Sequence, residues 1–183
     1  MMLAPLVVLA QLASSHGQTV PAAPSAAVSA AGGLSWTLPK GWTAAPGSSM
    51  RVATYRVPAA KGDKKDGEVA VFFFGPGQGG SIDANVQRWF SQLDPEPGSK
   101  KPSSGKTTVG TIPVTVVEAE GTYTGGMGMG AASTGPEKGF ALLGAIAEGK
   151  QGAVFFKLTG PKKTVAAAQK EFDALVKSLR AGS

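Results

Sequence analysis

The feature that most constrains the fold is a nearly unbroken apolar run at residues 68–74, with the sequence EVAVFFF. A strand with one face in water alternates apolar and polar residues, whereas a continuous apolar run is typical of a central strand covered on both faces. A charged turn at 61–67 precedes the run, and a glycine-rich loop at 75–80 follows it. The rest of the chain must therefore supply cover for both faces of a sheet.

Two amphipathic helices are predicted to supply this cover. The first begins after Ser81, whose hydroxyl is the expected N-cap, and ends before Pro95. Its apolar stripe consists of Ile82, Val86, Trp89, Phe90 and Leu93. The second runs from about residue 164 to 180, with an apolar stripe formed by Val165, Ala168, Phe172, Leu175, Val176 and Leu179.

Further strands complete an order of strands, helix, strands, helix. They are predicted at residues 34–38, 50–57, 107–109, 112–124, 140–147 and 153–159. Gly110 is the expected turn between two of them, and residues 148–152 are expected to join the last two as a hairpin. Because short connections favour antiparallel pairing, we predict an α+β domain: a twisted, mainly antiparallel sheet covered by two amphipathic helices.

The N-terminal region has the features of a signal peptide. Residues 3–13 form an apolar run that is too short to span a bilayer, and small residues permit cleavage after Ser15 or Gly17. The following segment is uncharged and rich in Ala, Ser and Pro, as flexible linkers are. We predict a periplasmic or secreted protein with no transmembrane segment in the mature chain; the alternative is a cytoplasmic protein with a disordered apolar N-terminus. The predicted organisation is a signal peptide at 1–17, a linker at 18–33 and a single domain at 34–183.

Residue composition limits the chemistry of this domain. The chain has no cysteine, and its one histidine, His16, lies in the predicted signal peptide. The domain thus lacks the residue types that most often act as nucleophiles, proton shuttles and soft metal ligands. We therefore expect no catalytic residue, no metal and no cofactor. The net charge of +6 comes from scattered lysines without an aromatic stripe, so nucleic acid is not an expected partner.

Three segments carry a resemblance to a known family. They are LSWTLPKGW at 34–42, VAVFFFGPGQGGSIDANVQRWFSQL at 69–93 and VFFKLTGPKKTVAAAQKEFDALVKSLR at 154–180. Together they resemble the PsbP-like domain, a small α/β fold named for an extrinsic photosystem subunit and also found in exported bacterial lipoproteins. The resemblance implies a fold and carries over no catalytic residue. The chain departs from the lipoproteins because no cysteine follows its apolar run.

The loop GPGQGGS at 75–81 is a candidate anion site. Gly79 and Gly80 lead into the first predicted helix, where backbone N–H groups can bind a phosphate or a carboxylate. The alternative is a flexible turn that uses glycine for unusual dihedral angles. Asn85 and Arg88 lie one turn further on, and Arg88 could hold an anion or simply anchor the helix to its neighbours.

Two further pairs of residues are candidate binding groups. Trp36 and Trp42 could form a surface platform for a sugar or a protein, or could be buried in the core. Met127 and Met129, in the glycine-rich loop at 125–135, could bind Cu(I) or adapt to a protein partner, unless that loop is merely mobile.

The leading functional hypothesis is an exported, non-catalytic binding or assembly module for a protein or an envelope polymer. One alternative is a carboxylate-based hydrolase, because Glu118 and Glu120 share a strand face; a cleft lined by both glutamates and Arg88 would favour it. The other is a small-ligand or metal carrier that acts through the Gly/Met loop.

Overall fold

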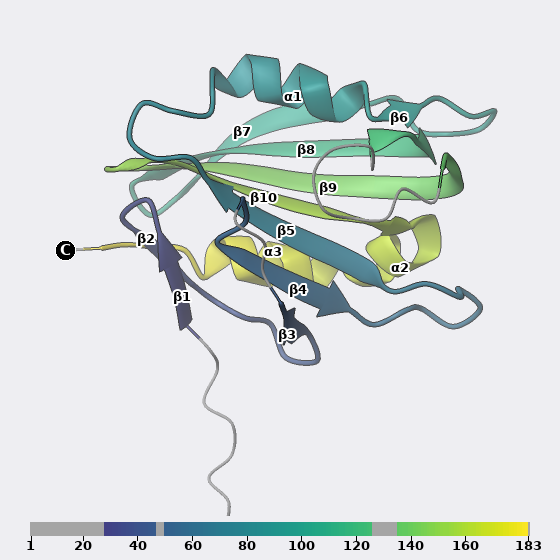
Figure 1. Ribbon diagram of the computed structural model, residues 1–183, viewed down its shortest axis with the longest axis horizontal. Coiled ribbons are helices and arrows are strands. Elements are labelled where there is room, and N and C mark those ends of the chain that lie inside the picture. The colour runs from purple at the N-terminus through teal and green to yellow at the C-terminus, as the bar shows by residue number, and fades with distance from the viewer. Residues whose placement is uncertain (1–27, 47–49, 126–134, 183) are drawn as a thin grey trace, which may run out of the picture.

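The computed structural model describes residues 28–46, 50–125 and 135–182. Within these residues the main element is an eight-stranded antiparallel sheet with the spatial order β3–β4–β5–β10–β9–β8–β6, in which β7 also pairs with β8 (Figure 1). Its strands are β3 (Thr43–Ala45), β4 (Ala53–Val57), β5 (Gly67–Phe73), β6 (Leu93–Asp94), β7 (Ser103–Val109), β8 (Ile112–Tyr123), β9 (Glu137–Gly149) and β10 (Gly152–Pro161).

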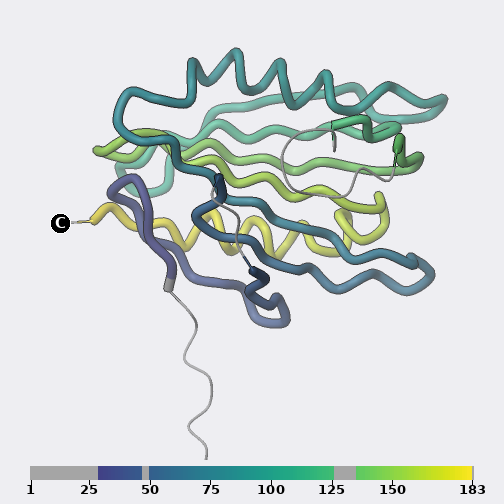
Figure 2. Tube along the Cα trace, viewed as in Figure 1, coloured from purple at the N-terminus to yellow at the C-terminus, as the bar shows by residue number. Residues whose placement is uncertain are grey.

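A smaller sheet lies beside the main one. It consists of β1 (Val28–Ala31), β2 (Leu34–Thr37) and β11 (Arg180–Ala181), so the C-terminal segment runs next to the first hairpin (Figure 2). Gly32 and Gly33 join β1 to β2 with φ angles of 62° and 75°, as a two-residue hairpin turn requires. The prediction of a linker up to residue 33 is therefore wrong over residues 28–33, and residues 1–27 lie outside the described residues.

Helices cover both faces of the main sheet. The first, α1 (Ile82–Phe90), lies on one face, and α2 (Lys162–Ala167) and α3 (Gln169–Lys177) lie on the other (Figure 1). The helix predicted at 164–180 therefore begins and ends earlier in the structure than the sequence indicates, and it is divided into two at Ala168. The Ala168 N–H still donates to the Thr164 carbonyl at 3.0 Å. The helix ends where the Arg180 guanidinium donates to the Lys177 carbonyl at 3.0 Å, as cations at helix C-termini often do.

Each face of the sheet has its own hydrophobic core. Val69 and Val71 of β5 face α2 and α3, together with Phe156 and Phe172, and the first three are completely buried. On the other side, Trp89 of α1 packs in a separate cluster against β8, β9 and β10; its other members include Val86, Val117, Leu142, Ile146 and Phe155. The predicted central strand and the α+β fold with an antiparallel sheet are confirmed.

Candidate functional site

The structure brings three of the predicted site residues together at the start of α1. The Asn85 side chain is buried and donates to the Gly79 carbonyl at 2.7 Å and to the Ser81 carbonyl at 2.9 Å. Arg88 donates to the Asn85 Oδ1 atom at 3.1 Å. Both amide donors of Asn85 are therefore used to fasten the loop onto the helix. The contact of Arg88 lies within α1, so anion binding by Arg88 stays a prediction.

Gly79 is required here for packing. A Cβ atom at this position would lie 2.9 Å from the Phe74 ring and 3.2 Å from the Phe155 ring, and the residue has a φ of 95°. Gly80 also has a positive φ, of 78°. These contacts explain the glycines without a ligand, and anion binding by residues 75–81 stays a prediction.

The two tryptophans are core residues. Trp36 is 1% exposed, donates from Nε1 to the Tyr55 hydroxyl at 2.8 Å and meets Phe156 edge to face at 5.0 Å. Trp42 is 7% exposed, although it reaches the wall of a shallow hollow of about 190 Å³. The surface-platform interpretation of both residues is therefore wrong, because each ring packs in the main core. Met127 and Met129 lie outside the described residues.

Glu118 and Glu120 line a polar cleft of about 80 Å³ between the sheet and α2. Glu120 binds Lys162 of α2 at 2.5 Å and accepts the Lys100 backbone N–H at 3.2 Å. Burial alone would raise the pKa of Glu120, but these two hydrogen bonds and the positive charges of Lys162 and Lys100 together leave the pKa below its ordinary value. Glu120 is thus a paired carboxylate, poorly suited to donate a proton at neutral pH.

The three residues that would favour a hydrolase do not share a cleft. The Glu118 carboxylate accepts from Gln169 of α3 at 3.4 Å, on the face covered by α2 and α3. Arg88 lies on α1, across the sheet. Among the described residues, no group of three or more His, Asp or Glu side chains is placed to hold a metal ion.

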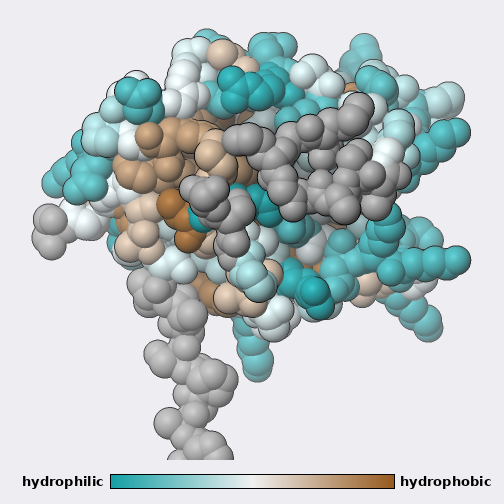
Figure 3. Space-filling model, viewed as in Figure 1, coloured by the Kyte–Doolittle hydropathy of each residue, from teal (hydrophilic) through white to brown (hydrophobic). Residues whose placement is uncertain are grey.

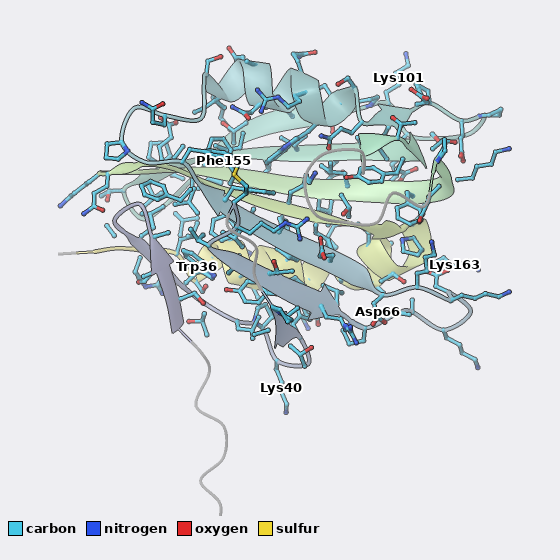
Figure 4. The ribbon with its side chains drawn as sticks, in the orientation of Figure 1. Trp36, Lys40, Asp66, Lys101, Phe155 and Lys163 are labelled. Atoms are coloured by element: carbon cyan, nitrogen blue, oxygen red, sulfur yellow. The ribbon has the colours of Figure 1, made fainter. Side chains whose placement is uncertain are left out.

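A larger groove continues from this cleft along α3. Its volume is about 270 Å³, and β7, β8 and α3 form its walls. Val109, Val116, Leu143, Phe172 and Val176 provide apolar lining, while Asp173 and Lys177 stand at the rim. Lys101 lines the adjoining polar cleft. Figure 4 shows Lys101 at the same end of the molecule as Asp66 and Lys163, whereas Trp36 and Phe155 lie toward the opposite end.

Next to the groove, β7 presents a free edge. Within the described residues it pairs only with β8, with Val109 opposite Ile112 and Thr108 opposite Pro113. Because proline has no N–H, the pair of Thr108 with Pro113 is a non-hydrogen-bonded pair. Hydrogen-bonded and non-hydrogen-bonded pairs alternate along an antiparallel ladder, so every second residue of β7 from Thr108 is not hydrogen-bonded to β8. The backbone N–H and C=O groups of Ser104, Lys106 and Thr108 therefore point outward.

Two features of the surface were missed from the sequence. The groove could not be found, because it depends on which strand lies next to α3. Lys157 had a visible signal, since it interrupts the apolar strand VFFKLTG. Its side chain lies on the α1 side of β10, half-buried, and donates to Gln92 and Tyr123.

Comparison with known proteins supports the fold. No protein-family model matches the chain, and no curated protein matches its sequence. The solution structure of cyanobacterial PsbP (CyanoP) from Synechocystis sp. PCC 6803 is similar at a TM-score of 0.51 and 12% identity, over 81% of this chain and 86% of that one. A crystal structure from Bacteroides thetaiotaomicron VPI-5482 gives a TM-score of 0.42 at 14% identity, over 82% of this chain and 46% of that one. The chain has a PsbP-like fold, as its sequence segments predict.

Proposed function

We propose that this protein is an exported, non-catalytic binding or assembly module that captures an extended segment of a partner protein. The observation that carries the proposal is the free edge of β7 beside the 270 Å³ groove. An exposed strand edge binds an added strand through main-chain hydrogen bonds, and an adjacent groove selects its side chains.

The binding mode follows from the geometry of β7. An added strand pairs with the outward groups of Ser104, Lys106 and Thr108. Alternate side chains of that strand then lie on the α3 side, against Val109 and Phe172, so an apolar residue is preferred there.

The ends of the groove add a charge preference. Lys100 and Lys101 are exposed where the groove meets the polar cleft, next to the paired Glu120. An acidic residue at the corresponding end of the bound segment would be favoured. The expected ligand is therefore an extended segment that combines an apolar residue with a nearby acidic one.

Export is supported by the apolar run at 3–13 and the small residues that follow it. Within the part of the chain that the structure describes, no helix has both the length and the apolar composition to cross a membrane. Mass spectrometry of protein from its natural source tests export. A mature chain that starts at His16 or Gln18 supports the proposal, and a chain that starts at Met1 contradicts it.

A proline substitution tests the binding mode. A display library of random peptides is selected on the wild-type chain, and the recovered peptides are titrated against Thr108→Pro and Thr108→Ala. Proline removes one outward N–H and leaves the pairing with β8 intact, whereas alanine changes the same side chain and keeps the N–H. We expect alanine to have little effect and proline to weaken binding roughly tenfold, the equivalent of about one hydrogen bond.

Two results would contradict the proposal: recovered peptides that bind the proline variant as tightly as the wild type, or selection that recovers no binding peptide. Circular dichroism verifies that both variants are folded.

A further inference from the structure

Lys157 occupies an unusual position on the α1 side of the sheet. It lies on β10 between Ala70 of β5 and Gly144 of β9. Its ammonium donates to the Gln92 side-chain oxygen at 3.1 Å and to the Tyr123 hydroxyl at 3.4 Å, and it lies 5.8 Å from the centre of the Tyr123 ring. Both hydrogen-bond acceptors are neutral, and an ammonium has three donors.

The charge of Lys157 has no direct counter-ion among the described residues, because none of their carboxylates lies within salt-bridge distance. The nearby Glu68 carboxylate is held by Arg51 at 2.7 Å. Burial, followed by repulsion from Arg51, lowers the pKa of Lys157 to about 8. Charges withdrawn from water are normally paired in proteins, so this partly buried ammonium has the capacity to bind an anion.

A second polar atom on this face also lacks a partner. Thr54 lies opposite Ala70, which in turn lies opposite Lys157, so all three share one row across the sheet. The Thr54 hydroxyl is buried and has no hydrogen-bond partner among the described residues. Buried hydroxyls are rarely left unsatisfied, so this row has hydrogen-bonding capacity that the described residues do not use.

An apolar patch adjoins this row. Met50, Val52 and Phe74 are 41%, 46% and 39% exposed. Figure 3 shows that apolar residues gather in one brown area of the visible surface. Phe72 stacks on Phe74 at 6.0 Å, and the Arg51 guanidinium lies 5.8 Å from the centre of the Phe72 ring. Exposed apolar groups gathered in one place are typical of ligand or partner sites.

We propose that Lys157 anchors a second binding site, on the α1 side of the sheet, for organic carboxylates with an apolar body. The carboxylate accepts hydrogen bonds from the Lys157 ammonium and the Tyr123 hydroxyl, and the body lies against Phe72 and Phe74. The site is independent of the β7 edge, because the groove lies on the other face of the sheet.

The charge requirement sets the pH dependence. The titratable groups that face Lys157 are Tyr123 of β8, Glu68 of β5 and Arg51. Glu137 of β9 lies next to Tyr123, and Gln92, which follows α1, is neutral. Burial, and then Glu68, raises the pKa of Tyr123, so its phenol stays protonated where Lys157 titrates. Carboxylate affinity should be constant between about pH 6, where the ligand is fully ionised, and about pH 8, and should fall by up to about tenfold per pH unit above that, as Lys157 loses its proton.

The test uses phenylbutyrate as the probe, with its uncharged amide as the matched ligand. Calorimetry and amide NMR spectra are recorded for the wild type, Lys157→Met, Lys157→Arg and the control Lys170→Met. Lys170 is an exposed lysine of α3, so its variant makes the same change in net charge on the other side of the sheet. We expect saturable binding of the acid, with Lys157→Met roughly tenfold weaker or worse and Lys170→Met unchanged.

The remaining outcomes also decide the proposal. Lys157→Arg keeps a charged donor and should retain part of the affinity. Equal binding of the amide, equal binding by Lys157→Met, or no saturable binding of phenylbutyrate by the folded wild type would each overturn the site.

Discussion

The packing of α1 on the sheet makes one substitution especially informative. Gly144 of β9 lies under Trp89 of α1, and a Cβ atom at Gly144 would lie 2.3 Å from Cζ3 and 2.6 Å from Cε3 of that ring. Ordinary carbon contacts are about 3.5 Å or longer, so Gly144→Ala must move the ring by about 1 Å. Trp89 is 5% exposed and has little free space to move into.

The expected cost follows from this overlap. Overpacking a core costs about 1–3 kcal/mol, and replacing glycine by alanine in a strand returns about 0.5–1 kcal/mol. We therefore expect Gly144→Ala to lower the free energy of unfolding by about 1–2 kcal/mol. Gly105→Ala is the matched control, because its Cβ would lie 3.7 Å from Val116, an ordinary contact. The control should raise the free energy of unfolding by up to about 0.5–1 kcal/mol, because it keeps the gain from replacing a strand glycine without the overlap.

Urea denaturation followed by far-ultraviolet circular dichroism measures both variants without relying on the fluorescence of the displaced tryptophan. Equal midpoints for Gly144→Ala and Gly105→Ala would refute the close approach of α1 to β9.

Two further predictions concern a helix start and a buried charge. Asp63→Ala should lower the free energy of unfolding by about 1–2 kcal/mol. The Asp63 carboxylate accepts hydrogen bonds from the Thr164 N–H at 2.9 Å and from the Thr164 hydroxyl at 2.7 Å, while Pro161 provides no side-chain cap for α2. An unchanged urea midpoint would disprove this. The pKa of Lys157 is about 8 when folded and near 10.5 when unfolded, so the unfolded chain binds more protons between these values and wild-type stability should rise there with pH. We expect the stability of Lys157→Met to lack this rise with pH. Parallel profiles of stability against pH for the wild type and Lys157→Met would contradict the prediction.

Much of the fold follows from short-range patterns in the sequence. The run at 68–74 indicates a central strand, and the spacing of Val86 and Trp89 indicates the face that α1 buries. Both patterns depend only on local periodicity, which a single sequence displays. The first hairpin was missed although Gly32 and Gly33 are a strong turn signal, because the surrounding Ala and Ser residues are typical of a linker.

The candidate sites were harder to predict because they depend on contacts between distant segments. Whether Trp36 is exposed depends on Tyr55 and Phe156, which follow it by many residues. That β7 is an edge strand depends on the order of the whole sheet. Lys157 gave a local signal, but the absence of a direct counter-ion among the described residues appears only once β5, β8 and β10 are assembled.

Amide hydrogen exchange of the chain, alone and saturated with a selected peptide, tests the use of the β7 edge most directly. In the free chain, the amides of Ser104, Lys106 and Thr108 should exchange quickly, while those of Gly105 and Thr107, which bond to β8, should be protected. Bound peptide should slow the exchange of the three outward amides and leave the other two unchanged. Outward amides that still exchange at the free rate in the saturated complex would contradict strand addition at β7.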